Sequence, residues 1–202
     1  MTAIVQDQVD EKKRRLLIIA TSVAGGVAGA AVAVPFLASW WPSARALAAG
    51  APVEADISRI EPGQQVTFEW RGKPIWVLRR TPEMLDGLAK HDALLVDPES
   101  KDSDQPEYIK GPTRSIKPEW FIATGVCTHL GCSPTLKKEI GAASDMGAEW
   151  PGGYYCPCHN SRFDLSARVF KGSPAPKNLV IPPHRYVSDT VVAIGEDSKK
   201  GA

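Results

Sequence analysis

The chain has 202 residues, a length that suggests one ordinary domain with some additional sequence. Charged residues make up 23% of it, the formal net charge is +1, and no basic stripe follows a pattern suited to phosphates, so nucleic-acid binding is not expected. The 17 prolines and 17 glycines favour a turn-rich β domain over a helical one.

The N-terminal part of the chain begins with polar residues 1–15, which end in the basic run KKRR. An uncharged apolar stretch follows, and Leu16–Ser39 exceeds the about 20 residues that a helix needs to cross a bilayer. A tryptophan pair comes next, as interfacial aromatic residues often do. We therefore expect a transmembrane anchor over residues 16–41, with the N-terminus in the cytoplasm and the rest of the chain outside.

Arg14 and Arg15 allow two interpretations. The pair can be a plain basic flank that orients the span, or it can be a twin-arginine export signal, which it resembles. We favour the export signal as the function of residues 1–15. A cleaved secretory peptide, cut at the A-x-A sequence 46–48, is a competing interpretation, but secretory apolar regions span about 7–15 residues and this one is longer.

Residues 42–52 are small and weakly polar, and a proline stands at both ends of the segment. We expect a flexible, partly helical tether here. It should join the anchor to a head domain over residues 53–202, which we expect to be a small, mainly β fold with antiparallel strands.

Several segments of the head show the features of strands, in which β-branched or aromatic residues alternate with polar ones between turn signals. A short helix is expected over residues 81–88, with Thr81 as its N-cap. Residues 97–118 contain four prolines and should form an extended surface loop. The expected strands are 53–60, 64–70, 74–80, 119–126 and 187–194.

All four cysteines lie in two short motifs, CTHLGC and CPCHNSRFD, and each motif contains a histidine. Cys127 and His129 are two residues apart, so an extended loop can project both to one side. Cys156 and His159 are three residues apart, a distance that a tight turn can close. The two motifs together therefore offer two thiolates and two imidazoles.

Such a set of side chains has three interpretations. A structural zinc site would leave Cys132 and Cys158 without a role, and two disulfides would make the repeated pairing of cysteine with histidine a coincidence. An iron–sulfur cluster with two cysteine and two histidine ligands would use every cysteine, because the remaining pair can form a disulfide, which suits an exported domain. His91 and His184 have no cysteine or second histidine nearby and are not expected to be ligands.

The two motifs resemble the paired boxes of the Rieske iron–sulfur subunit of ubiquinol–cytochrome c reductase, the cytochrome bc complex. Gly172–Pro176 resembles the proline-rich loop that covers the cluster in that family, and Trp70–Pro74 is similar as well. The anchor and tether occur in the same order, so the resemblance extends from Arg14 to about Gly195. It implies a Rieske head with a cluster-binding subdomain.

The resemblance implies one 2Fe-2S cluster of the Rieske type, bound as a metal and cofactor by residues of both motifs. Ser161 would donate a hydrogen bond to the cluster and so raise its potential. The ligands would be Cys127 and Cys156 on one iron and His129 and His159 on the other, and Cys132 and Cys158 would form a disulfide.

Two neighbouring residues gain roles from the same resemblance. Leu130 matches an apolar residue beside the exposed histidine, near the place where quinol docks. Phe163 stands where the family often has a tyrosine that donates a hydrogen bond to a ligand sulfur, which phenylalanine cannot do. We therefore do not expect the highest potentials of the family.

The function implied is that of a subunit in a proton-translocating respiratory enzyme. The head would take one electron from quinol, with the proton passing to His129 or His159, and would then deliver the electron to a membrane-bound c-type cytochrome. The expected partners are quinol, cytochrome b and that cytochrome, in a complex that is dimeric. The chain would not act alone, because half of the quinol site belongs to cytochrome b.

The expected location is the bacterial inner membrane, with the head in the periplasm. Iron–sulfur clusters are normally inserted in the cytoplasm, so the head would cross the membrane already folded, which favours the twin-arginine interpretation. The alternative function is the Rieske small subunit of a periplasmic molybdenum oxidase such as arsenite oxidase. A structural zinc module without a redox role is a further alternative.

Overall fold

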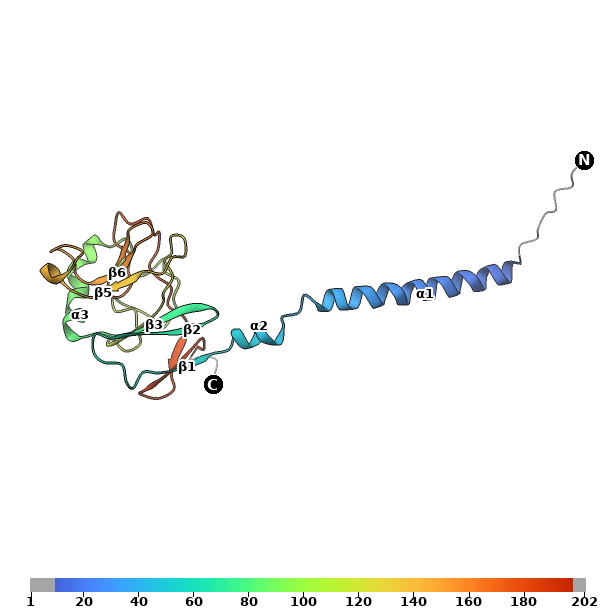
Figure 1. The fold of residues 1–202 in the computed structure, drawn as a ribbon, viewed down its shortest axis with the longest axis horizontal. Coiled ribbons are helices and arrows are strands. Elements are labelled where there is room, and N and C mark those ends of the chain that lie inside the picture. The colour runs from blue at the N-terminus through green and yellow to red at the C-terminus, as the bar shows by residue number, and fades with distance from the viewer. Residues whose placement is uncertain (1–9, 198–202) are drawn as a thin grey trace, which may run out of the picture. The chain divides into compact units, whose positions relative to one another are not determined.

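The computed structural model describes residues 10–197 of the chain (Figure 1). It divides into two compact units, with the boundary between Ala48 and Ala49. Residues 1–9 of the expected N-terminal segment and residues 198–202 of the expected head lie outside the described residues. The exact domain boundaries that we expected therefore stay predictions.

The first unit contains helix α1 (Glu11–Ala38) and all but the last residue of the short helix α2 (Ala44–Ala49). The Asp10 side chain caps α1 by accepting hydrogen bonds from the backbone N–H groups of Lys12 and Lys13, at 3.0 and 3.2 Å. The helix therefore begins before the apolar stretch and includes the basic run. By length and composition it is long and apolar enough to cross a membrane.

The second unit is built from three small antiparallel sheets, which confirms the expected mainly β fold. Strands that are distant in sequence form the first sheet, which consists of β1 (Val53–Asp56), β9 (Val191–Ile194) and β8 (His184–Tyr186). The second consists of β2 (Gln65–Trp70), β3 (Lys73–Arg79) and β4 (Trp120–Thr124). The third consists of β5 (Thr135–Lys137), β6 (Gly153–Cys156) and β7 (Ser161–Phe163).

The observed sheets differ from the strands expected from sequence in two places. The segment 187–194 is only partly a strand, because β8 and β9 form a hairpin that turns at residues 187–190. The third sheet was not among the expected strands. Its elements have three or four residues each, too few to show a clear alternation of apolar and polar side chains.

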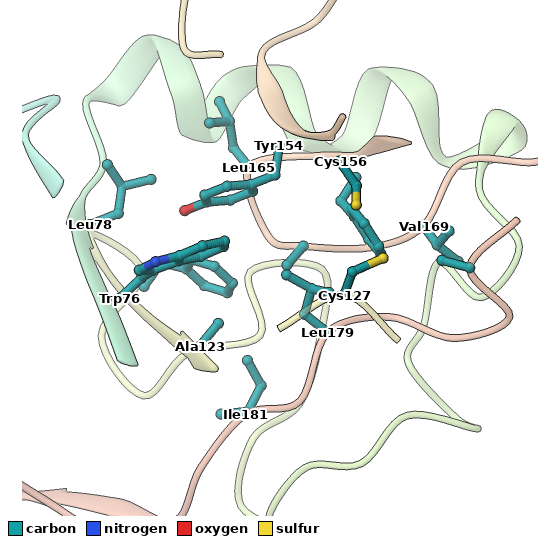
Figure 2. Packing of buried hydrophobic residues seen from close by; sticks show 14 of the residues in the cluster. Trp76, Leu78, Ala123, Cys127, Tyr154, Cys156, Leu165, Val169, Leu179 and Ile181 are labelled. Atoms are coloured by element: carbon teal, nitrogen blue, oxygen red, sulfur yellow. The ribbon is translucent and has the colours of Figure 1, made fainter. Parts of the chain in front are cut away.

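Strand β3 lies between two hydrophobic cores, because successive side chains of a strand point to opposite faces. Ile75 and Val77 pack with residues of the first sheet, such as Val192. Trp76 and Leu78 point into the other core, which also includes Cys127 and Cys156 of the two cysteine motifs (Figure 2). The second sheet therefore packs against the part of the head that contains the motifs.

The aromatic side chain of Trp76 is central to this second core. It stacks on Tyr154 of β6, with ring centroids 4.8 Å apart and planes tilted by 7°. Gly125, which follows β4, has no side chain because a Cβ atom there would lie 2.2 Å from the Trp76 ring. This close approach sets the point from which the chain enters the first cysteine motif.

The segments between the sheets include the expected short helix, α3 (Pro82–Gly87), which is capped by the Thr81 hydroxyl as predicted. A 3-10 helix, η1 (Leu88–Leu94), continues it, and η2 (Gly141–Ala143) precedes β6. Residues 97–118 contain no helix or strand, and most of them are exposed or half-buried, as expected for a surface loop. Ile109, Arg114 and Ser115 are among the buried exceptions, and Arg114 bonds to the carbonyl of Ser166, just after the second motif.

Candidate metal centre

The first cysteine motif forms a tight loop after β4. The backbone N–H of Cys127 donates to the carbonyl of Cys132 at 2.7 Å, and the N–H of Gly131 donates to the carbonyl of Cys127 at 3.0 Å. Gly131 has a φ of 85°, a left-handed conformation that favours glycine. These bonds bury Cys127, leave His129 half-buried and expose Leu130 at the tip, where its side chain is 70% accessible.

The second motif forms the hairpin between β6 and β7. Cys156 pairs with Ser161 across the hairpin, and residues 157–160 make the connecting loop. The N–H of Asn160 donates to the carbonyl of Cys156 at 2.9 Å and closes this loop. As a result Cys156 is buried at the end of a strand, whereas His159 is exposed at the surface.

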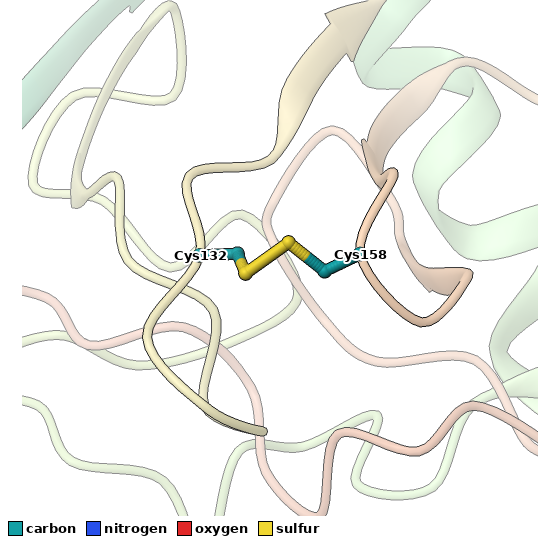
Figure 3. The surroundings of a disulfide bond; sticks show 2 residues. All are labelled: Cys132 and Cys158. Atoms are coloured by element: carbon teal, nitrogen blue, oxygen red, sulfur yellow. A yellow bond between two sulfur atoms is a disulfide. The ribbon is translucent and has the colours of Figure 1, made fainter.

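A disulfide joins the two loops, between Cys132 and Cys158 (Figure 3). This is the pairing that the resemblance implied. The two residues are 26 positions apart in sequence, and their Cα atoms lie 6.7 Å apart. The bond therefore holds together two loops that β5 and β6 bring to the same end of the head.

The remaining two cysteines are free thiols, and both are buried. The Cys127 sulfur lies within hydrogen-bonding reach of Cys156, of the Ser161 hydroxyl and of the backbone N–H of His129. Burial raises the pKa of the Cys127 thiol. A cationic centre would have to displace this proton, because a ligand cysteine binds as the thiolate.

The two motif histidines lie beside one another. Their rings meet edge to face, with centroids 4.7 Å apart. Nδ1 of His129 is buried and has no hydrogen-bond partner among the described residues. A buried, unpartnered ring nitrogen is costly unless something binds it, so this atom points to a ligand role. Two buried thiols and two adjacent imidazoles are the donor set of a Rieske 2Fe-2S cluster, and these residues fit it.

A single metal ion fits the geometry less well. Among residues 10–197, one group of side chains has its ligand atoms within 4.8 Å of one another, and it consists of Cys132, Cys156 and Cys158. The first and last of these are joined in the disulfide, so they have no thiolate to offer. The cysteine and histidine pairs do not converge as the four ligands of one tetrahedral zinc would.

A third loop, which contains the sequence GSPAP, lies against both motifs. Ala175 donates its N–H to the Ser161 hydroxyl oxygen at 3.1 Å, which leaves the hydroxyl proton free to point toward the Cys127 sulfur. The Thr128 hydroxyl donates to the carbonyl of Lys177 at 2.6 Å. The proline-containing loop therefore contacts the site as expected, through one hydrogen bond to each motif.

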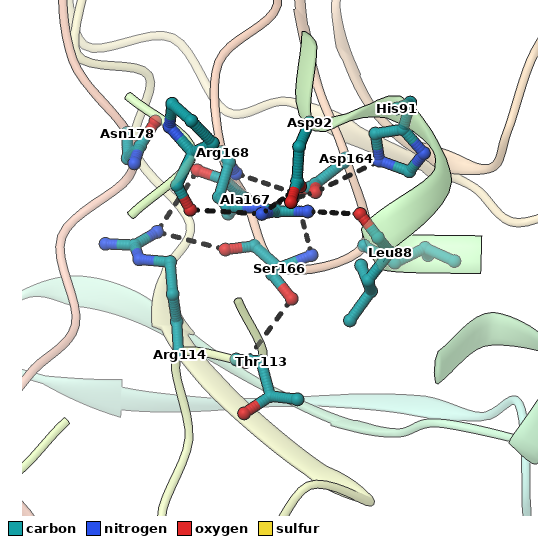
Figure 4. A network of polar contacts seen from close by, with 12 residues as sticks. Leu88, His91, Asp92, Thr113, Arg114, Asp164, Ser166, Ala167, Arg168 and Asn178 are labelled. Carbon is teal, nitrogen blue, oxygen red and sulfur yellow. Dashed lines mark hydrogen bonds and ion pairs between the residues drawn. The ribbon is translucent and has the colours of Figure 1, made fainter. Parts of the chain in front are cut away.

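A network of buried charges holds the end of the second motif (Figure 4). Asp164 and Arg168 are both fully buried and pair at 2.7 Å, and Arg168 also binds Asp92 at 2.7 Å. Burial opposes ionisation of Asp164, but hydrogen bonds from His91 and Arg168 and the charge of Arg168 outweigh it and lower its pKa. The carboxylate thus stays ionised inside the protein.

Two further buried arginines hold the same segment through its backbone. Arg114 donates to the carbonyls of Ser166, Ala167 and Leu179, at 3.0, 3.2 and 2.7 Å. Arg80 donates to the Ser166 hydroxyl at 2.8 Å. Burial lowers the pKa of each guanidinium to about 10, so both remain cationic near neutral pH. These arginines were not expected to be buried, since nothing in their local sequence distinguishes them from surface residues.

The two other histidines lie where they serve the fold. Nε2 of His91 is 3.3 Å from a carboxylate oxygen of Asp164, so His91 is a buried member of the charge network. Nδ1 of His184 is 2.8 Å from the carbonyl of Pro182, and burial lowers the pKa of its ring. Both bond to groups other than the motif cysteines and histidines.

Comparison with protein families identifies both parts of the chain. Residues 52–183 match the family described as Rieske [2Fe-2S] domain. Residues 5–43 match the family described as Ubiquitinol-cytochrome C reductase Fe-S subunit TAT signal. The order of the two matches agrees with the anchor and head expected from sequence.

Comparison with individual proteins gives matches over nearly the whole chain. The Ubiquinol-cytochrome c reductase iron-sulfur subunit of Allochromatium vinosum is 60% identical over 189 residues, which cover 94% of this chain and 91% of that protein. The protein of the same name from Bradyrhizobium diazoefficiens is 40% identical over 91% of this chain and 94% of its own length. The Cytochrome b-c1 complex subunit Rieske, mitochondrial, of Gallus gallus is 38% identical over 96% of this chain and 65% of its own length.

Proposed function

This chain belongs to the family of ubiquinol–cytochrome c reductase iron–sulfur subunits. On that basis we propose how its two cysteine motifs bind a cluster and transfer electrons from quinol. It is the electron-transfer subunit of a quinol–cytochrome c oxidoreductase and carries one Rieske 2Fe-2S cluster. Its partners are the cytochrome b and c1 subunits of a cytochrome bc complex, and its N-terminal apolar helix anchors it to a membrane. Relatives of this kind disfavour the molybdenum oxidase alternative.

We propose that one cysteine and one histidine of each motif are the cluster ligands. The observation that carries this assignment is the buried Nδ1 of His129, which has no partner among the described residues and lies in a ring that touches His159. The free, buried thiols supply the other two ligands, because the disulfide excludes the remaining cysteines. The proposed ligands are Cys127, His129, Cys156 and His159.

When bound, a Rieske cluster accepts and releases one electron at a time. The protein supplies the contact with quinol. His159 is exposed and His129 is half-buried, so an imidazole is available at the surface to bind a quinol hydroxyl and take its proton. Leu130, which is 70% accessible, offers apolar surface beside them for the quinol ring. These exposed side chains cover quinol from one side only, so cytochrome b must supply the other side.

Purification from membranes tests this function. The chain should copurify with b-type and c-type haem in an assembly whose mass fits a dimer of the complex. The assembly should reduce cytochrome c with quinol as the electron donor. Recovery of the chain with a molybdenum protein, or of a haem-free particle without quinol oxidation, would contradict the proposal.

We further propose that the head lies in the periplasm of a bacterium and crosses the inner membrane already folded. The basic pair Arg14 and Arg15 lies in the first part of α1, before the apolar residues of the helix. Changing the pair to Lys-Lys keeps the charge but removes the twin-arginine pattern, so the folded head should remain in the cytoplasm. Protease digestion of intact spheroplasts measures this. If the variant head is digested as fully as the wild-type head, the pair serves only to orient the helix.

Ser161 should raise the potential of the site. Its hydroxyl reaches the Cys127 sulfur, and a donor to sulfur stabilises the reduced, more negative state. Ser161→Ala should lower the midpoint by about 20–65 mV, which corresponds to one hydrogen bond of about 0.5–1.5 kcal/mol in a one-electron couple. Redox titration checks this, with Ser188→Ala, in the turn between β8 and β9, as control. A midpoint equal to that of the control would exclude this role for the hydroxyl.

A substitution at Phe163 should shift the midpoint potential in the opposite direction to Ser161→Ala. Phe163 is fully buried in β7, beside the strand that ends at Cys156. Phe163→Tyr should raise the midpoint, because a hydroxyl there would add a donor to a ligand sulfur. Potentials that stay flat in both variants would contradict this account of how the protein tunes its site.

A further inference from the structure

The loop between β6 and β7 carries His159, and its conformation decides where that ring lies. The His159 side chain has no hydrogen bond to any residue among 10–197 in the structure, and its ring contact is with His129. Its direction therefore depends on the backbone on each side. The disulfide at Cys158 holds the N-terminal side.

The C-terminal side of His159 depends on Asn160. This residue has a φ of 63°, in the left-handed region that non-glycine residues rarely adopt. Asparagine is one of the few side chains that tolerate it. The N–H of Asn160 donates to the carbonyl of Cys156 at 2.9 Å, so the left-handed conformation closes the loop onto the strand that bears a ligand cysteine.

Tyr155 reaches this position from the neighbouring strand. Alternation along β6 places Tyr155 on the face opposite to Tyr154 and Cys156, which point into the core. On that outer face Tyr155 lies across from Arg162, and its hydroxyl donates to the side-chain oxygen of Asn160. The residue after His159 is thus held by one backbone bond and one side-chain bond.

We propose that Tyr155 and Asn160 are positioning residues for His159. Their hydrogen bond keeps Asn160 left-handed and thereby directs the His159 imidazole toward the ring of His129, so that both imidazoles would be available to the same iron. This inference rests on the proposed ligand role of His159. It assigns a function to a tyrosine–asparagine contact that lies outside the hydrophobic core.

The hydrogen bond is close to the surface, since Asn160 is exposed and Tyr155 is only half-buried. Removing it should therefore leave the fold intact and act on the ligand. The test uses the full-length protein with its cluster, purified from membranes, as wild type, Tyr155→Phe, Asn160→Gly and the double variant. Tyr186→Phe, on β8 of the first sheet, is the matched control for loss of a tyrosine hydroxyl.

Two measurements report on the ligand. Pulsed electron paramagnetic resonance of the reduced protein gives the couplings of the two ligating nitrogens, and absorbance in the presence of an iron chelator gives the rate of cluster loss. In Tyr155→Phe, one nitrogen coupling should change while the other stays as in wild type. Cluster loss should become about threefold to tenfold faster, the factor that corresponds to one hydrogen bond.

The double variant separates a coupled pair from two independent effects. If the two side chains act through their mutual bond, Tyr155→Phe should add nothing to Asn160→Gly, in either the coupling or the rate. A Tyr155→Phe effect that persists in full in the Asn160→Gly background would overturn the proposal. Unchanged couplings with only a lower unfolding temperature would also overturn it, since the bond would then be merely structural.

The nitrogen couplings of the wild-type protein test the proposed histidine ligands separately from the positioning role of Tyr155 and Asn160. Two nitrogen couplings in wild type support histidine ligation, and the variants then decide the role of Tyr155 and Asn160 alone. A wild-type protein without two such couplings would overturn both the ligand assignment and the positioning role that depends on it.

Discussion

Replacing His129 or His159 with alanine should abolish the Rieske spectrum and, with it, quinol oxidation by the complex. Each substitution removes one of the two imidazoles whose rings lie 4.7 Å apart. The iron would be left with a single nitrogen ligand. The two other described histidines have different partners, the carboxylate of Asp164 for His91 and the carbonyl of Pro182 for His184. The expected loss is complete, to below about one hundredth of wild-type activity, as for the removal of a metal ligand rather than of a supporting residue.

Iron and acid-labile sulfide analysis, with the spectrum of the reduced protein, measures this result. His184→Gln is the matched control, because His184 is buried but bonds to the carbonyl of Pro182 in the first sheet. The control should keep its cluster content. A normal spectrum in either motif variant would show that the ligands have been assigned wrongly.

Replacing Arg168 with methionine should destabilise the head by about 3–5 kcal/mol, the cost typical of breaking a buried ion pair by removing one partner. Arg168 is fully buried and bonds to Asp164 and Asp92, and to the carbonyls of Leu88 and Pro98. Without it, the carboxylate of Asp164 would remain in the interior with the single side-chain partner His91.

The shift of the urea midpoint, followed by tryptophan fluorescence of the full-length protein in detergent, measures this loss. Lys101→Met is the control, because the pair of Lys101 with Glu99 is as short, at 2.6 Å, but exposed. An exposed pair contributes about 0–1 kcal/mol. If both variants shift the midpoint equally, the burial of Arg168 does not add to the strength of its contacts.

The same network should make stability depend on acid pH. The pKa of Asp164 is lower in the folded protein than its ordinary value of 3.8, so its ionised form stabilises the fold. That contribution is fully present above the unfolded-state pKa, near pH 4, and is lost as the pH falls through the lower folded-state pKa. Asp164→Asn should remove this part of the acid dependence, in urea titrations repeated from pH 7 downward.

The amino-acid sequence by itself determined that each motif offers a cysteine and a histidine to a metal site, and that a long apolar stretch precedes the head. The spacing of cysteine and histidine is local and limits what each loop can bind, whereas the particular ligand set was implied by the resemblance to the Rieske subunit. The apolar residues of α1 and the alternation along β2 and β3 are local as well, so these elements were expected where they lie. Thr81 was recognisable as a cap for the same reason, since a cap acts within one helical turn.

Other features depend on residues that are far apart in the chain. Strands β5, β6 and β7 are short and gain their stability from pairing with one another, which no window of sequence reveals. The turn that divides the segment 187–194 arises because β9 must pair with both β1 and β8. Sequence alone could not show these pairings.

The buried charges were decided only by the tertiary structure. Arg80, Arg114, Arg168 and His91 are polar residues whose local sequence gives no sign that they are buried. Each is buried because the folded chain brings carbonyls or carboxylates from distant segments to within hydrogen-bonding distance, as for Arg114 and the carbonyl of Leu179 at 2.7 Å. A buried charge is tolerated only when partners compensate its lost hydration, and the fold, rather than the local sequence, determines whether those partners are present.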